Sequence, residues 1–342
     1  MKHLFFDDYS EGAHPEILKA LAEANGGQQA GYGLDEYSKL AAQRIANALK
    51  ADADVHLIMG GTQANQIGLA SILRHHEGII VADMAHINTH EAGAIETTGH
   101  KIISAPSKDG KLTPDDIERL AEHMPDHQVK PAVVAITQPT EMGALYSKKE
   151  LEAVIKVAKK HGLIVYVDGA RMGVGVTAPK SEVRLEDLAP LGIDMLYLGG
   201  TKNGALCGEA MVVFNPELKK DFRYHIKQRG GLMAKGRLMG VQFARFFDED
   251  NLWLQLGEQA NNSAEKLTNG LQKLNIEFAL PPATNQLFLI LENNLIEKLQ
   301  KDYGFYVWEK LDDTKSVVRL VCSWATPAEM IDEFLADFKK LV

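Results

Sequence analysis

The sequence predicts an α/β protein with a large, mostly parallel, doubly wound sheet domain and a smaller C-terminal α/β domain. Three observations lead to this prediction. Between residues 51 and 214, short apolar runs of strand length alternate with helical stretches, as in repeated βαβ units. After about residue 215 long helical stretches take over, and the chain ends in the order strand, helix, strand, helix. The length of 342 residues also suits two domains of ordinary size.

The predicted strands of the large domain are uninterrupted apolar runs rather than alternating ones. Such runs are typical of strands that are buried on both faces of a parallel sheet. They cover residues 55–59, 79–81, 101–103, 133–136, 163–167, 195–198 and 211–214.

Helix signals separate these strands. A helical stretch runs from residue 63 to 75. Thr113-Pro114, followed by acidic residues, marks another helix start, because threonine caps a helix and acids favour its first turn. Residues 148–161 carry apolar side chains at positions 151, 154, 155 and 158, a helical stripe that Gly162 ends.

The C-terminal part begins with the clearest helical stretch, residues 252–274. We place a domain boundary near residue 250, which divides the chain into residues 1–250, including an N-terminal arm, and residues 251–342. The elements predicted after the long helix are strands at 286–291 and 317–321 and helices at 295–303 and 327–341.

The composition limits the class of partner. The chain has 37 Lys and Arg against 46 Asp and Glu, a net charge of −9, which disfavours nucleic acid because binding a polyanion needs surplus cations. No apolar run approaches the length of about 18 residues that spans a membrane. Two cysteines cannot form a disulfide framework, and Asp7-Asp8 interrupts the N-terminus before a signal-peptide core. We therefore expect a cytoplasmic protein that binds neither nucleic acid nor a membrane.

Three strand ends carry residues with chemical potential, and ligands bind beyond the carboxyl ends of the strands in such sheets. Asp168 and Arg171 follow one apolar run, and Lys202 follows another in a glycine-rich turn. Gly61 and Thr62 follow a third run at a helix N-terminus, which favours a phosphate. Singly, each has an ordinary explanation as a turn or cap. Together they offer an amine, a carboxylate and an anion site, which are the handles of pyridoxal 5′-phosphate (PLP).

Other cofactor classes fit less well. Residues 173–178 match the dinucleotide-binding fingerprint by letter, but Pro179 and a polar stretch follow where the fingerprint needs a helix. A Walker phosphate loop is missing, and neither His-Glu-x-x-His nor paired cysteines indicate zinc. We predict no metal site.

Seven segments occur in the order seen in one known family, and they span nearly the whole chain. They are Gly31-Tyr32-Gly33-Leu34-Asp35, Gly61-Thr62-Gln63-Ala64-Asn65-Gln66, Ala85-His86-Ile87, Glu91-Ala92-Gly93, Asp168-Gly169-Ala170-Arg171, Thr201-Lys202 and residues 319–324. The chain thereby resembles the low-specificity L-threonine aldolases, β-eliminating lyases with a fold-type-I PLP-dependent transferase-like fold. The Asp-Gly-Ala-Arg and Gly-Thr-x-Ala-Asn-Gln motifs are specific in combination.

The resemblance implies a role in cofactor binding for five residues. Lys202 would bind PLP covalently through its amine. Asp168 would pair with the pyridine nitrogen and His86 would stack on the ring. Gly61 and Thr62 would donate hydrogen bonds to the phosphate.

It also implies a substrate site shared between subunits. Arg171 and Arg319 would bind the substrate α-carboxylate, and Arg171 would also contact the cofactor. Tyr32 would reach the cofactor of a neighbouring subunit, and Lys227 would contribute to the phosphate site across the interface. The implied assembly is a homodimer or homotetramer.

The activity that the resemblance implies is retro-aldol cleavage of L-threonine, L-allo-threonine or a related β-hydroxy amino acid to glycine and an aldehyde. The alternative is a PLP-dependent β-eliminating lyase or an aminotransferase-like enzyme. Two departures from the family pattern motivate it. Asp7-Asp8-Tyr9 replaces a Ser-Asp-Thr segment, and Thr140 falls where the family has a histidine, so that His86 or Glu141 would serve as the base.

Overall fold

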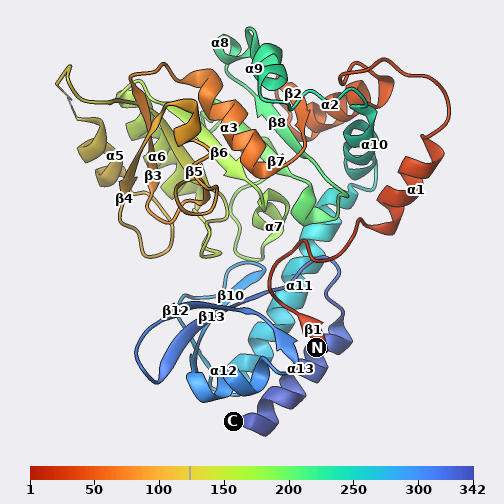
Figure 1. Cartoon of the computed structure of the whole chain (residues 1–342), viewed down its shortest axis with the longest axis vertical. Coiled ribbons are helices and arrows are strands. Elements are labelled where there is room, and N and C mark those ends of the chain that lie inside the picture. The colour runs from red at the N-terminus through yellow and green to blue at the C-terminus, as the bar shows by residue number, and fades with distance from the viewer. Residues whose placement is uncertain (123–124) are drawn as a thin grey trace.

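The computed structural model describes residues 1–122 and 125–342, and within them its larger part is built on a seven-stranded sheet (Figure 1). The strand order is β2-β8-β7-β6-β5-β3-β4. Four consecutive pairs, from β7 to β4, are parallel, whereas β8 runs antiparallel to β7 and β2. The strands are β2 Asp54–Ile58, β3 Glu77–Ala82, β4 Lys101–Ala105, β5 Lys130–Thr137, β6 Ile164–Gly169, β7 Met195–Gly199 and β8 Glu209–Val213.

Helices cover both faces of this sheet, because successive side chains of a strand point to opposite faces. On β6, Val165 and Val167 pack into one buried cluster, while Tyr166 packs into another. The helices around the first cluster are α1 Pro15–Glu23, α2 Glu36–Leu49, α5 Pro114–Ala121, α6 Lys148–Lys160, α7 Met172–Thr177 and α10 Arg237–Phe246. On the other face lie α3 Gly61–Ile72, α4 His86–Thr89 and α9 Phe222–Gln228.

The smaller part is an antiparallel sheet in the order β12-β13-β10-β9 with helices packed against it. Its buried cluster combines apolar residues of the sheet and of the helices. The elements are β9 Glu277–Phe278, β10 Gln286–Glu292, β12 Tyr306–Lys310, β13 Lys315–Val321, α12 Asn293–Leu299 and α13 Ala328–Leu341.

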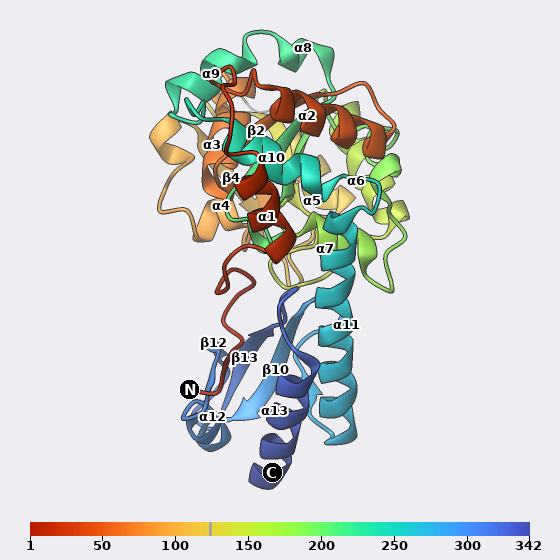
Figure 2. The same ribbon diagram turned by 90° about the vertical axis from the view of Figure 1, so that its right-hand side faces the viewer.

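Two segments connect the two parts, and both can be followed in Figure 2. The long helix α11, Leu252–Lys273, packs Trp253 into the large core and Leu267 into the small one. The N-terminal strand β1, His3–Leu4, pairs with β11, Tyr303–Gly304, in the small part before the chain crosses to α1. The proposed division at residue 250 falls just before α11.

The predicted fold class is confirmed, and the predicted strands of the large sheet all occur, with ends shifted by a few residues. Several elements were not predicted, among them α1 and α2 in the first 50 residues and α7 and β12 further along the chain. Residues 173–178 were considered only as a dinucleotide-binding fingerprint, and β12 is not an apolar run, since its Tyr306 and Val307 are exposed. In the described residues, no helix is long and apolar enough to cross a membrane.

Candidate active site

A cavity of about 370 Å³ lies at the carboxyl ends of β5, β6 and β7, beside the N-terminus of α3. The strand-end residues singled out in the sequence meet in its wall. The predicted site residues that line it are Gly61, Thr62, His86, Asp168, Arg171 and Lys202.

Lys202 lies in the loop that joins β7 to the antiparallel β8. Gly200 N–H donates to a carboxylate oxygen of Glu209 (2.8 Å), and Gly208 N–H donates to the Thr201 hydroxyl (3.2 Å), so both sides of the loop are tied together. Burial lowers the pKa of Lys202, and the charge of Arg171 adds to this effect against three carboxylates that oppose it. A lowered pKa favours the neutral amine, which is the nucleophile that attacks an aldehyde.

Asp168, at the end of β6, is oriented by three donors. Tyr197 Oη donates to Oδ1 at 2.6 Å, Ala170 N–H donates to the same oxygen at 3.0 Å, and Asn65 Nδ2 donates to Oδ2 at 3.0 Å. The carboxylate is therefore held in one orientation in the cavity wall, as a partner for a protonated ring nitrogen must be.

The N-terminus of α3 faces the cavity with Gly60, Gly61 and Thr62. Its N-cap is Gly60, and no side chain in the described residues caps it, so backbone N–H groups remain for an anion. A Cβ at Gly61 would lie 3.1 Å from Tyr197 Oη, so the close packing here favours glycine. With Lys202 and Asp168, this uncapped helix end fits the aldehyde, ring nitrogen and phosphate of PLP.

His86 is the first residue of α4, and Glu91 holds its imidazole in place. Its Nδ1 lies 2.8 Å from Glu91 Oε1, and the same oxygen accepts a hydrogen bond from Asn65. Asn65 thus connects the Glu91 and Asp168 carboxylates. This fixes the plane of the imidazole at the cavity wall.

Arg171 makes a bidentate ion pair with Asp8 of the N-terminal arm. Its Nε and Nη2 donate to the two oxygens of Asp8 at 2.7 and 3.0 Å, and Asn285 Nδ2 donates to Asp8 as well (3.0 Å). Burial alone would raise the pKa of Asp8, but Arg171 and Lys202 outweigh it and lower that pKa. The pair thus uses the edge of the guanidinium that carries Nε and Nη2.

Arg319, on β13, lies close to this pair without lining the cavity. Its guanidinium carbon lies 4.9 Å from the Trp308 ring and 5.4 Å from the Tyr306 ring, and Nη2 donates to the carbonyl of Phe6. Its Nε is buried without a hydrogen-bond partner in the described residues. A cation with an unused donor fits the carboxylate role that the family resemblance gives it.

Tyr32 and Lys227 lie away from the cavity wall. Lys227 Nζ lies 4.8 Å from the centre of the Tyr32 ring, and Tyr32 is 45% exposed. The structure therefore pairs these two residues with each other and does not bring them to this chain's cavity.

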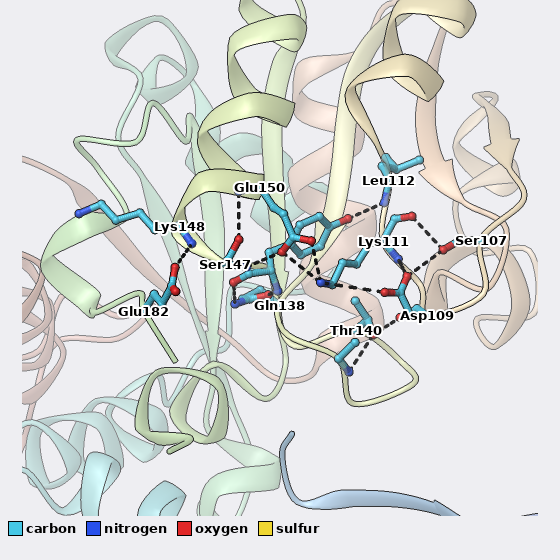
Figure 3. A network of polar contacts seen from close by, with 12 residues as sticks. Ser107, Asp109, Lys111, Leu112, Gln138, Thr140, Ser147, Lys148, Glu150 and Glu182 are labelled. Atoms are coloured by element: carbon cyan, nitrogen blue, oxygen red, sulfur yellow. Dashed lines mark hydrogen bonds and ion pairs between the residues drawn. The ribbon is translucent and has the colours of Figure 1, made fainter. Parts of the chain in front are cut away.

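Thr140 cannot replace the family histidine, because its hydroxyl is used in hydrogen bonds to the backbone of its own loop and of the loop that contains Asp109. It donates to the backbone carbonyl of Asp109 and accepts from Ala144 N–H (3.1 Å). Figure 3 shows this loop among the polar contacts of Ser107, Lys111, Gln138 and Glu150. The next residue, Glu141, reaches the cavity instead.

Sequence reasoning missed four polar residues of the site: Asp8, Asn65, Tyr197 and Glu209. Asn65 and Asp8 stood in segments that were noted, but without a role. Tyr197 and Glu209 are hidden in apolar strands, where a single polar atom gives no pattern. Burial raises the pKa of Glu209, and the charge of the nearby Lys202 opposes this effect.

In residues 1–122 and 125–342, no group of three or more His, Cys, Asp or Glu side chains is arranged so that it could hold a metal ion.

Comparisons with known proteins find relatives over nearly the whole chain. The β-eliminating lyase family matches residues 5–294. A low specificity L-threonine aldolase from a Pseudomonas species is 35% identical over 341 residues, which cover 98% of this chain and 96% of the relative. The solved structure of Leishmania major threonine aldolase is 44% identical, covers 99% of both chains and superposes with a TM-score of 0.97.

A more distant structure extends the fold assignment. An aspartate aminotransferase from Thermus thermophilus is 15% identical, covers 99% of this chain and 91% of its own, and has a TM-score of 0.72. That likeness concerns the fold alone, which is fold type I. From the family match and the Pseudomonas relative, the chain belongs to the β-eliminating lyases and, among them, to the low-specificity L-threonine aldolases.

Proposed function

We propose that this protein is a PLP-dependent aldolase that cleaves L-threonine, L-allo-threonine or a related β-hydroxy-α-amino acid to glycine and an aldehyde. The observation that carries the proposal is the convergence of Lys202, Asp168 and the uncapped N-terminus of α3 in one cavity. The cofactor is PLP, which when bound supplies an electron sink for the bonding pair left on Cα.

The proposed cofactor site follows from these positions. Lys202 holds the cofactor aldehyde, Asp168 holds the ring nitrogen in its protonated form, and His86 lies against the ring. Gly61 and Thr62 donate to the phosphate at the positive end of the α3 dipole. Such fixed charges cost no reorganisation during the reaction, which is why they stabilise a transition state well.

The proposed substrate site uses two arginines. Arg171 and Arg319 bind the α-carboxylate, and Asp8 holds Arg171 in place. Since guanidinium binds a carboxylate in a plane, this contact orients the Cα–Cβ bond relative to the ring.

The proposed assembly is a homodimer or homotetramer in which Tyr32 and Lys227 complete the cavity of a neighbouring subunit. The exposure of Tyr32 and its distance from this chain's own cavity wall support this arrangement. The proposed location is the cytoplasm, where the free thiols of Cys207 and Cys322 would stay reduced.

A product assay separates the proposal from the alternative β-eliminating lyase or aminotransferase-like activity. The PLP-loaded protein is incubated with L-threonine, L-allo-threonine, β-phenylserine and serine. We expect glycine and the matching aldehyde from the first three. Ammonia and a keto acid from threonine would contradict the aldolase assignment.

Covalent capture tests the cofactor site independently of turnover. Borohydride should fix PLP on Lys202, as mass spectrometry of the digested protein would show. The Lys202→Ala variant should lose this adduct and the yellow colour. An adduct of unchanged yield in that variant would contradict the role of Lys202.

A further inference from the structure

Glu141 has one carboxylate oxygen that is bound and one that is not. Its Oε1 accepts hydrogen bonds from the backbone N–H of His86 (2.8 Å) and the hydroxyl of Thr137 (3.1 Å). Its Oε2 is buried and has no hydrogen-bond partner in residues 1–122 and 125–342. The residue lies in the cavity wall near Asp168, Arg171 and the other groups described above.

The loop that carries Glu141 is rigidly held. Gln138 and Tyr146 exchange two hydrogen bonds across it, of 3.0 and 3.3 Å. Thr140 ties it to Asp109 on one side (Figure 3), and Thr284 donates to its Gly143 carbonyl on the other. The carboxylate is thus placed in the cavity by the surrounding backbone, independently of any ligand.

A buried polar atom without a partner destabilises the folded state, so its retention calls for an explanation. The other carboxylates in the cavity wall differ in this respect. Asp168 accepts three hydrogen bonds, and Glu209 accepts from Gly200 beside Lys202. Among the carboxylates in the described cavity wall, Glu141 is the one with a buried oxygen still free to accept.

We propose that Glu141 Oε2 is the base that takes the β-hydroxyl proton of the substrate during carbon–carbon cleavage. This inference rests on the proposed aldolase function and adds a catalytic residue to it. Burial raises the pKa of Glu141, and the neighbouring Asp168 charge adds to the effect. A carboxylate with a raised pKa is a stronger base than a solvated one and is therefore better matched to a hydroxyl.

The proton and electron changes balance without a further reagent. The proton moves from the β-oxygen to Oε2, and the O–H electron pair forms the aldehyde C=O bond. The Cα–Cβ bond breaks and leaves its pair on Cα. A proton added at Cα gives glycine, and Glu141 returns its proton to the site, so no net acid or base is consumed.

His86 has a different place in this scheme. Its Nδ1 is bound to Glu91, and the ring is assigned to stacking on the cofactor. Its backbone N–H also fixes Glu141 Oε1, so the two residues act at neighbouring positions with distinct tasks.

The test compares two reactions of the holoenzyme. Cleavage of L-threonine needs a base for the β-hydroxyl, whereas exchange of the glycine α-proton in D2O does not, because glycine has no β-hydroxyl. We expect Glu141→Gln to lower kcat for cleavage by about 10²–10⁴-fold, the usual contribution of a positioned base. The rate of glycine exchange, followed by NMR, should change by less than about threefold, and the cofactor spectrum should stay the same, because the loss is confined to that base.

Two further variants make the result interpretable. Glu141→Asp keeps a carboxylate and should restore part of the cleavage rate, which also covers the case in which Glu141→Gln folds poorly. Glu150→Gln, an exposed position near the same loop (Figure 3), should leave both reactions unchanged.

Two outcomes would overturn the inference: cleavage by Glu141→Gln within threefold of the wild-type rate, or equal losses of cleavage and exchange with normal cofactor binding. Failure of the proposed function looks different, because the wild-type protein itself would then lack PLP-dependent cleavage and exchange.

Discussion

The cavity at the strand ends and the Tyr32–Lys227 pair were both predicted to be parts of one site, but their side chains are in opposite situations. In the cavity, Asp168 and Arg171 have their partners within the same chain, at 2.6–3.0 Å. Tyr32 and Lys227 contact each other near the surface. The polar groups of the first region are paired within one chain, whereas the second region presents its groups outward.

Tyr32 is nevertheless held firmly in place. Its backbone has φ +58°, a left-handed conformation that costs free energy in a residue other than glycine. Its N–H donates to the Ala234 carbonyl (3.1 Å), and its carbonyl accepts from Arg223 (2.9 Å). Strain that the surroundings maintain at an exposed residue is typical of a functional position, which agrees with a role toward a second subunit.

Complementation between subunits is expected to give the largest difference between the cavity and the Tyr32–Lys227 pair. Lys202→Ala and Lys227→Ala should each be poorly active alone when PLP is limiting. Co-expressed with different tags, they should recover about one quarter of the wild-type sites, since half of randomly formed dimers are mixed and each holds one intact site. In the purified doubly tagged fraction, which contains mixed dimers alone, the activity should therefore correspond to about half of the wild-type sites.

The control for this experiment replaces an exposed lysine that lies just before α9. Lys220→Ala is expected to be fully active alone and in mixtures. If the mixed dimers of Lys202→Ala and Lys227→Ala stay as inactive as their parents, Lys227 does not act across an interface and the comparison fails.

Much of the cavity was predictable because it follows from local patterns and one topological rule. Asp168, Gly61 and Lys202 follow apolar runs within one to four residues, and parallel strands bring their carboxyl ends together. Thr113 likewise marks the start of α5, where the structure has a reciprocal capping box with Asp116.

The rest depends on contacts between distant parts of the chain. Asp8 and Arg171 are 163 residues apart, and nothing in either segment specifies the other as its partner. The sequence did not show that β8 is antiparallel to β7, because an apolar run has no direction. This antiparallel pairing ties the loop that carries Lys202 to Glu209. Tertiary packing, rather than propensity, places these groups.

The next largest effect is on stability, because substitutions in the cavity and in the Tyr32–Lys227 pair should change the free energy of unfolding by different amounts. Asp8→Ala should lower the free energy of unfolding by about 3–5 kcal/mol, because Arg171 is left buried without its counter-charge. Lys227→Ala should cost no more than about 0.5 kcal/mol, as for an ordinary surface substitution. Urea unfolding of both variants measures the difference. Losses of equal size would mean that the Asp8–Arg171 pair is no more important for folding than the surface pair.

The smallest expected effect is a pH dependence of stability that comes from His56, a residue beside Tyr32. His56, on β2, lies beside Tyr32 in a small pocket and packs on the Phe222 ring at 5.0 Å. Burial lowers its pKa from the ordinary 6.5 to about 4, with Asp54 opposing and Arg223 adding to the shift. The unfolded chain therefore binds this proton more readily than the folded one, so stability is lost as the pH falls from about 6.5 toward 4 and is fully present above that range.

His56→Phe should remove this acid sensitivity while keeping a ring on Phe222. At pH 5 the histidine costs about 1–2 kcal/mol relative to pH 7, and the variant should show a flatter profile of unfolding free energy over this interval. His127→Asn is the matched control, since His127 is exposed and should leave the profile as it is. If His56→Phe and wild type lose stability in parallel below pH 6.5, another group governs the acid response.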